Sequence, residues 1–174
     1  MNQIVPASKR PGTELAAPET QDYVTMFIDG QMFGIAVLTV QDVLGPQKIT
    51  RIPLAPREVA GSLNLRGRIV TAIDVRLRLG LKQTGDDFKG MSVVVEQGGE
   101  LYSLMVDQVG EVVAAGCGGD EVGEVLSLPV AKFERNPPTL DLVWREFSAG
   151  IYRLDDKLLV VLDVAKLLDF NRSE

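Results

Sequence analysis

The sequence predicts a mainly β fold with short helices, built from two related β-subdomains. Short runs of β-forming residues alternate with Gly, Asp and Pro turn signals along most of the chain. Pairs of segments also resemble each other in the same order, as expected for a duplicated unit. With 174 residues, 45% apolar and 24% charged, the chain can form one domain with a sizeable core or two small ones that share an interface.

The most regular stretch is Gly61–Gly80, which predicts strand, turn, strand and helix. Two runs of β-formers, Ser62–Arg66 and Arg68–Ile73, flank Gly67, which tolerates the positive φ of a tight turn. Asp74 follows the second strand and can cap a helix, and the final glycine can end it. This unit should therefore be the centre of one subdomain.

The other elements follow from the same rules of turn chemistry and hydrophobic period. Asp-Gly and Gly-Gly turns predict hairpins, apolar residues three and four apart predict a helix, and a second strand followed by Asp repeats the capped helix. The expected elements are hairpin strands Tyr23–Ile28 and Gln31–Ala36, helix Val37–Leu44, strand Lys48–Ile52, hairpin strands Met91–Glu96 and Glu100–Val106, a packed connector at Leu128–Phe147, hairpin strands Ser148–Leu154 and Lys157–Leu162, and helix Val164–Phe170 after Asp163.

Two internal repeats suggest the duplication, although ordinary hairpin and strand-cap-helix patterns could also produce them. At an offset of 69, Gly30–Ile35 matches Gly99–Leu104 and Val40–Val43 matches Val109–Val112; at an offset of 89, Arg68–Val75 matches Lys157–Val164. A local repeat, Asp107–Val112 and Asp120–Val125, flanks a small glycine-rich segment without a phosphate-binding motif. We expect a flexible insertion at about 112–124 within a domain at 21–170, and tails at 1–20 and 171–174.

The composition excludes several classes of function. The chain has no histidine and only Cys117, which removes Ser-His and Cys-His nucleophiles, disulfides and most metal sites, so neither a cofactor nor a metal is expected. A net charge of −6 disfavours nucleic acid, and no apolar run approaches the roughly 20 residues of a membrane span. We therefore expect a cytoplasmic protein without direct membrane insertion.

Positive charge is concentrated in residues 48–78. Seven basic residues against two acidic ones give 7 − 2 = +5, so the rest of the chain carries −6 − 5 = −11. This segment is either a solvated surface with clustered charges or a docking face for an acidic partner. Its basic residues are Lys48, Arg51, Arg57, Arg66, Arg68, Arg76 and Arg78.

The motif Asn64-Leu-Arg-Gly67, followed by an apolar strand and an Asp-led helix, resembles the signature of the CheW chemotaxis coupling proteins. Further similar blocks are FGIAVLTVQDVLG at Phe33–Gly45, ITRIP at Ile49–Pro53 and the ending at Tyr152–Leu168, so the resemblance covers about 21–170. It implies two intertwined five-stranded β-barrels resembling SH3 domains and no catalysis. It also implies an adaptor that links the cytoplasmic tip of methyl-accepting chemotaxis receptors to the regulatory domain of the CheA histidine kinase in arrays.

The resemblance also implies a receptor- and kinase-binding site between the barrels. An apolar groove with a charged rim can hold a helical hairpin, and the Arg66 guanidinium could bridge Asp42 and a partner carboxylate or carbonyl. Asp42 departs from the glutamate common in the family, and Val43 and Leu63 could equally be core residues. The candidate residues are Val40, Asp42, Val43, Gly61, Leu63, Asn64, Arg66, Gly67 and Val106.

Two alternatives remain open at this level. One is a coupling protein for a CheA-type pathway outside chemotaxis, which the sequence does not distinguish. The other is a small carboxylate-dependent enzyme on a β-barrel scaffold, which needs clustered acids with raised pKa values in a pocket. Turns and helix caps explain most of the aspartates, so the enzyme is the weaker alternative.

Overall fold

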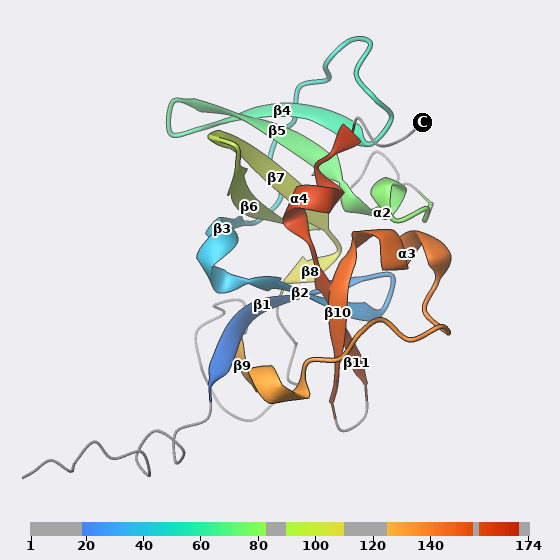
Figure 1. Cartoon of the computed structure of the whole chain (residues 1–174). Coiled ribbons are helices and arrows are strands. Elements are labelled where there is room, and N and C mark those ends of the chain that lie inside the picture. Colours follow the sequence, from blue (N-terminus) through green and yellow to red (C-terminus); the bar gives the residue numbers. More distant parts are fainter. Residues whose placement is uncertain (1–18, 83–89, 110–124, 155–156, 171–174) are drawn as a thin grey trace, which may run out of the picture.

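The computed structural model describes residues 19–82, 90–109, 125–154 and 157–170, and in these ranges the chain is mainly β (Figure 1). The strands are β1 (Thr20–Ile28), β2 (Gln31–Ala36), β3 (Val40–Leu44), β4 (Val59–Leu65), β5 (Arg68–Asp74), β6 (Met91–Gln97), β7 (Glu100–Val106), β8 (Gln108–Val109), β9 (Val125–Pro129), β10 (Ser148–Arg153) and β11 (Leu158–Leu162). The helical elements are short: η2 (Val37–Thr39), α2 (Val75–Arg78), η3 (Val130–Lys132), α3 (Leu142–Phe147) and α4 (Val164–Leu167).

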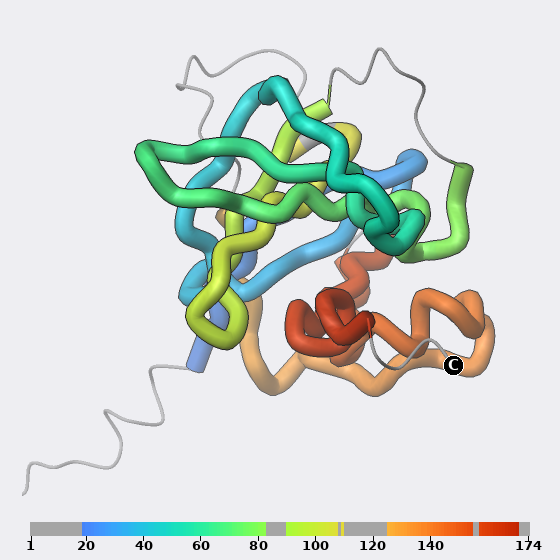
Figure 2. The backbone as a smooth tube through the Cα atoms, turned by 90° about the horizontal axis from the view of Figure 1, so that it is seen from above, coloured from blue at the N-terminus to red at the C-terminus, as the bar shows by residue number. Residues whose placement is uncertain are grey.

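The strands form two sheets that exchange segments. The six-stranded sheet has the order β10-β11-β2-β1-β8, with β9 also paired to β1, and the five-stranded sheet has the order β3-β6-β7-β5-β4. The chain starts in the first sheet, crosses into the second at β3 and returns at β8. In Figure 2 the green and yellow segments, β4 to β7, lie on one side of the molecule and the orange and red C-terminal segments on the other. The predicted fold class, intertwined and mainly β, is confirmed.

Strand register supports duplication over chance similarity. Val40 pairs with Val95, and the positions related by the offset of 69, Val109 and Met26, pair with each other. Ala72 and Ser103 are parallel partners, and the offsets of 89 and 69 relate them to Val161 and Gly34, which are also parallel partners. Each repeat therefore gives its first two strands to one sheet and its last strands to the other.

Among the described residues, alternation along the strands builds three hydrophobic cores. Val70 and Ala72 point into the interior of the five-stranded sheet, whereas Ile73 contributes to a larger core that contains residues of both sheets. Tyr23 and Leu159 belong to a third core, within the six-stranded sheet. β5 thus contributes apolar side chains to two cores. Burial of this apolar area is the main stabilising contribution of such a strand.

The predicted turns and caps are present. Asp29 and Gly30 have φ values of 53° and 79°, as a two-residue hairpin turn requires. Asp74 Oδ1 accepts a hydrogen bond of 3.2 Å from the backbone N–H of Leu77, at the start of α2. Asp163 caps α4 in the same way, with 3.2 Å from its Oδ1 to the N–H of Lys166.

The predicted helix at Val37–Leu44 is wrong beyond its first turn. Only η2 is helical, and Val40–Leu44 forms β3, an outer strand paired with β6. A register shift between Val40 and Asp42 inserts an extra residue, so that Val40 and Val43 both pack on the shared core although they are three residues apart. The bulge therefore imitates helical spacing, and the β-branched residues favour the strand.

Three further expectations need correction. The strand expected at Lys48–Ile52 is a loop in which Thr50 alone forms a bridge, to Ser62. The connector at Leu128–Phe147 includes the end of β9, the turn η3 and the helix α3. The C-terminal helix ends at Leu167, three residues before the expected Phe170, because four residues complete the turn that Asp163 caps.

The two copies of the local repeat contribute residues to two short strands, β8 and β9, which both pair with β1. β8 pairs with Met26 and Phe27 of β1, and β9 begins opposite Val24, so the two short strands continue one another along β1. The first copy supplies β8 and the last residue of the second copy, Val125, begins β9. The expected insertion and Cys117 lie outside the described residues, as do 1–18, 83–89, 155–156 and 171–174. The expected N-terminal tail at 1–20 is too long, because Thr20 is already the first residue of β1.

Candidate functional site

The turn that joins β4 to β5 presents Arg66 to solvent. Arg66 and Gly67 occupy its two central positions with φ values of 53° and 85°, and the side-chain oxygen of Asn64 accepts a hydrogen bond of 2.9 Å from the Gly67 N–H. Asn64 therefore shapes the turn. The positive φ of Arg66 is sterically unfavourable for any residue with a Cβ, and glycine would avoid this strain. The Arg66 side chain is nevertheless 81% exposed, so burial does not compensate for it. An exposed arginine with a strained backbone is better explained by binding to another molecule than by a contribution to stability.

Arg66 and Asp42 form an ion pair, with 3.3 Å between Nη2 and Oδ2. Asp42 lies on β3 and Arg66 follows β4, and these are the two outer strands of the five-stranded sheet. The pair therefore joins the two edges, which requires the sheet to curl towards a barrel. Thr50 and Ser62 close the same sheet with two backbone hydrogen bonds of 2.8 Å.

The other predicted site residues fall into two groups. Val40 and Val43 are half-buried on the shared core, in the strand that carries Asp42. Leu63 and Val106 are buried, and Val106 has no exposed surface with which to contact a partner in this conformation. Gly61 is a packing residue: its φ is +153°, and a Cβ there would overlap the carbonyl oxygen of Thr50. The structure thus pairs Arg66 with Asp42 on the strand that carries the half-buried valines, leaves Asn64 and Gly67 exposed in the turn, and buries Gly61, Leu63 and Val106.

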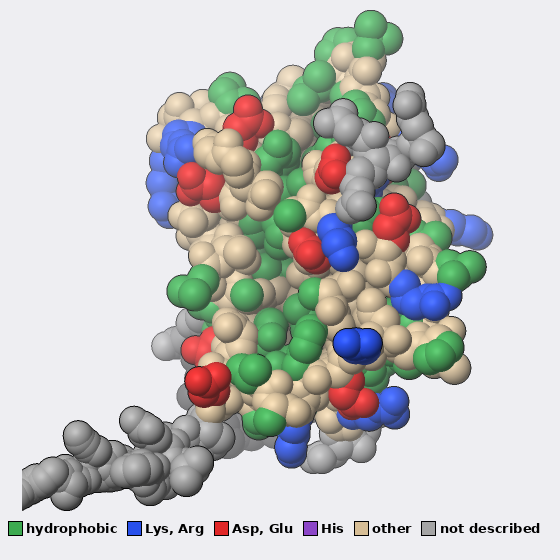
Figure 3. Space-filling view, in the orientation of Figure 1, with side chains coloured by type: hydrophobic (Ala, Val, Ile, Leu, Met, Phe, Trp, Pro, Cys, Tyr) green, Lys and Arg blue, Asp and Glu red, His purple; other side chains and the backbone are tan. Residues whose placement is uncertain are grey.

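Only part of the basic segment is available to a partner. Arg78 is buried, and Arg76 binds Asp107 through two hydrogen bonds of 2.7 and 2.6 Å. This contact lowers the pKa of Asp107, because the guanidinium stabilises the ionised carboxyl more than partial burial disfavours it. In Figure 3, Lys and Arg side chains gather at the upper left, where Figure 1 places the β4–β5 turn. The exposed arginines of the segment are Arg51, Arg57, Arg66 and Arg68.

The loop before β4 adds an exposed apolar residue that the sequence interpretation missed. Leu54 is fully exposed and has a φ of 61°, between Pro53 and Pro56, with Arg51 and Arg57 nearby in sequence. A leucine in this conformation gains nothing from burial and is strained by its backbone. The signal was present in the pair Leu54-Ala55, which stands between two prolines directly after the expected strand Lys48–Ile52.

The aspartates near these elements have structural roles. Asp74 is buried as the cap of α2, and burial raises its pKa. Asp29 lies in a hairpin turn and Asp163 caps α4. Within the described ranges, no group of three or more His, Cys, Asp or Glu side chains could hold a metal ion. No helix in the described part of the chain is long and apolar enough to cross a membrane.

Comparison with known proteins agrees with this architecture. A chemotaxis protein CheW from Klebsiella aerogenes is 27% identical over 148 residues, covering 85% of this chain and 81% of that protein. The CheW of Treponema pallidum is 26% identical over 148 residues, covering 83% and 79%. The crystal structure of the scaffolding protein TtCheW from Thermoanaerobacter tengcongensis superposes with a TM-score of 0.73 at 26% identity, covering 88% of this chain and 95% of that one. The family model described as the CheW-like domain matches residues 22–116, more than half of the sequence, and the chain therefore belongs to the CheW-like domain family.

Proposed function

We propose that this protein is a non-enzymatic adaptor that couples methyl-accepting chemotaxis receptors to the CheA histidine kinase in signalling arrays. Membership of the CheW-like domain family supports an adaptor role in chemotaxis, as does the similarity to a protein described as a scaffold. The observation that carries the proposal is the exposed Arg66 guanidinium on a turn with positive φ, held on one side by Asp42.

Arg66 can bind a partner without losing its position. An arginine has five N–H donors in a planar fork, and the ion pair with Asp42 occupies only one side of it. The remaining donors can bind a carboxylate or a main-chain carbonyl at the tip of a receptor hairpin. The half-buried Val40 and Val43 on β3 can contact an apolar face of the same helical hairpin.

Charge supports the same kind of partner. Arg51, Arg57 and Arg68 are exposed along with Arg66, so the surface around β4 is basic in a chain of net charge −6. Such a surface favours acidic protein partners and speeds their association at low salt. A CheA-type pathway outside chemotaxis would use the same contacts, and only the identity of the receptor would differ.

Co-sedimentation with receptor-containing membranes and CheA tests the proposal. We expect Arg66→Ala and Val43→Asp to weaken co-sedimentation about tenfold, which corresponds to about 1.4 kcal/mol. Arg135→Ala is the control, since Arg135 is exposed and lies outside the basic segment. An unmodified protein that sediments with neither partner would refute the adaptor function. Unchanged sedimentation of both test variants would reject the assigned surface alone.

A further inference from the structure

The two repeats make an internal comparison possible, because the positions in the matched strands, turns and capped helices have counterparts in the same molecule. The strand pairs that match at offsets of 69 and 89 relate the tip of the β1–β2 hairpin to the tip of β6–β7, and α2 to α4. These offsets relate Asp29 to Gly98, Asp107 to Leu38 and Arg76 to Ala165. An arginine and two aspartates in one half of the molecule thus correspond to alanine, leucine and glycine in the other.

In the first half, Arg76 joins α2 to the β1–β2 hairpin. Its guanidinium binds Asp107 at 2.6 and 2.7 Å and lies 3.8 Å from an Asp29 carboxylate oxygen. Asp107 in turn accepts a hydrogen bond of 2.8 Å from the Asp29 N–H, and its own N–H donates to the carbonyl of Phe27. The Arg76 and Asp107 side chains are only 19% and 27% exposed, so water screens the contact between them weakly. We call Arg76, Asp107 and Asp29 the clamp.

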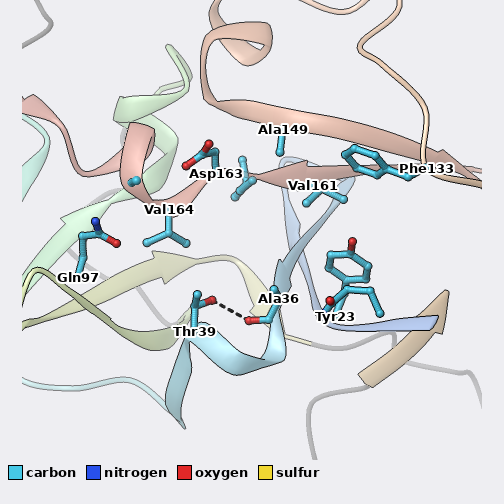
Figure 4. A pocket seen from close by; sticks show the side chains of 12 residues that line it. Tyr23, Ala36, Thr39, Gln97, Phe133, Ala149, Val161, Asp163 and Val164 are labelled. Atoms are coloured by element: carbon cyan, nitrogen blue, oxygen red, sulfur yellow. Dashed lines mark hydrogen bonds between the residues drawn. The ribbon is translucent and has the colours of Figure 1, made fainter. Parts of the chain in front are cut away.

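In the second half a pocket of about 370 Å³ is lined mainly by residues of β1, β11 and the start of α4, and Gln97 is its one lining residue from the β6–β7 hairpin. In the view of Figure 4, Gln97, at the end of β6, and Val164, at the start of α4, lie on the same side of the lining, with Val161 and Phe133 on the other side and Thr39 below. The Thr39 hydroxyl donates a hydrogen bond of 2.7 Å to the Ala36 carbonyl, within its own turn. Among the described residues no ion pair joins α4 to this hairpin.

The substitutions remove the clamp from this half. Leu38, the counterpart of Asp107, is 88% exposed and so contributes no buried contact. Ala165 lacks the side chain with which Arg76 spans the equivalent space. The hairpin tip carries Gly98 and Gly99 in place of Asp29 and Gly30, which increases its backbone freedom.

We infer that the molecule is rigid in one half and adjustable in the other: the clamp holds the β1–β2 tip against α2, whereas the β6–β7 tip, which has no such clamp, moves against α4 together with Gln97 at the edge of the pocket. Segments with few buried contacts open locally at low free energy, while the rest of the fold stays closed. The inference does not depend on which partner Arg66 binds, because Arg66 lies in the β4–β5 turn and the inference concerns the β1–β2 and β6–β7 turns.

Native-state hydrogen exchange of the unmodified protein tests this inference with a control inside the chain. Gln31 and Glu100 occupy the same register position in the two hairpins, next to Ile28 and Gln97. We expect the protection factor at Glu100 to be at least tenfold lower than at Gln31. Arg76→Ala should lower the protection at Gln31 at least tenfold and leave Glu100 unchanged. Equal protection at the two amides of the unmodified protein would overturn the inference.

A transplant of the clamp provides the converse test. The triple variant Leu38→Asp, Gly98→Asp and Ala165→Arg copies the clamp into the second half, and Gly98 has a φ of 62°, close to the 53° of Asp29. We expect it to raise protection at Glu100 about tenfold. The control carries Leu38→Asp and Gly98→Asp without the arginine and should not do so. Equal protection in the two variants would contradict the inference, and if the triple variant does not fold, the comparison of Gln31 with Glu100 decides.

Discussion

Replacing Arg78 by methionine should lower the free energy of unfolding by about 3 kcal/mol. Arg78 is 7% exposed and lies between two aromatic rings, with its guanidinium carbon 4.7 Å from the centres of both Phe147 and Phe170. It also donates hydrogen bonds of 2.8 Å to the carbonyls of Leu167 and Asp169, at the end of α4. One side chain from the first repeat therefore completes the last helix of the second.

The magnitude follows from these contacts. Hydrogen bonds from a charged donor contribute about 1.5–3 kcal/mol each, and cation–π contacts about 0.5–2 kcal/mol each. Methionine fills a similar volume but leaves two helix-end carbonyls without this donor. Methionine also avoids the desolvation cost of a buried guanidinium, and this offsets several kcal/mol of the lost contacts. The net decrease in the free energy of unfolding is about 3 kcal/mol. For a chain of this size that corresponds to a fall in Tm of about 6–12 °C.

Urea unfolding followed by the fluorescence of Trp144 is a suitable assay. This single tryptophan donates a hydrogen bond of 3.1 Å to the carbonyl of Leu79, beside Arg78, and its ring lies 5.3 Å from that of Phe33. Arg68→Met is the matched control, because Arg68 is exposed in the same unit and should change stability by less than about 0.5 kcal/mol. Equal losses in the two variants would refute the reasoning.

Two further predictions concern packing and pH. Gly61→Ala should destabilise the fold by about 2–4 kcal/mol because its Cβ would overlap the Thr50 carbonyl, whereas Gly67→Ala, with open space around it, should cost about 1 kcal/mol; thermal unfolding distinguishes them, and similar losses would contradict the packing role. Because Arg76 lowers the pKa of Asp107, the stability that this carboxylate adds is present above about pH 4 and is lost as the pH falls through its folded value. The difference in unfolding free energy between the unmodified protein and Asp107→Asn should therefore shrink from about pH 6 to about pH 3 in urea titrations, and a constant difference would reject the assignment.

Local chemistry made much of the fold predictable. The turns at Asp29-Gly30 and Arg66-Gly67 and the caps at Asp74 and Asp163 depend on residues adjacent in sequence, and all four are present. The helix expected at Val37–Leu44 failed because a bulge, made possible only by pairing with β6, placed Val40 and Val43 on one face. Pairing with a distant strand is invisible to local periodicity.

The candidate site divides in the same way. Sequence resemblance identified Arg66 and Asp42, and the fold brings them to 3.3 Å by curling the five-stranded sheet. It could not reveal that Val106 is buried, because an apolar strand residue fits a core and a binding surface equally well.

The sequence by itself determined the turns, the capped helices and the repeat, since each is encoded within a few residues or by direct comparison of segments. Only the tertiary structure decided that each repeat divides its strands between two sheets, that Arg76 and Arg78 serve internal contacts, and that one half is clamped while the other holds a pocket. The physical reason is that charge and apolar area act through proximity in space, and proximity between distant segments is set by strand pairing and packing.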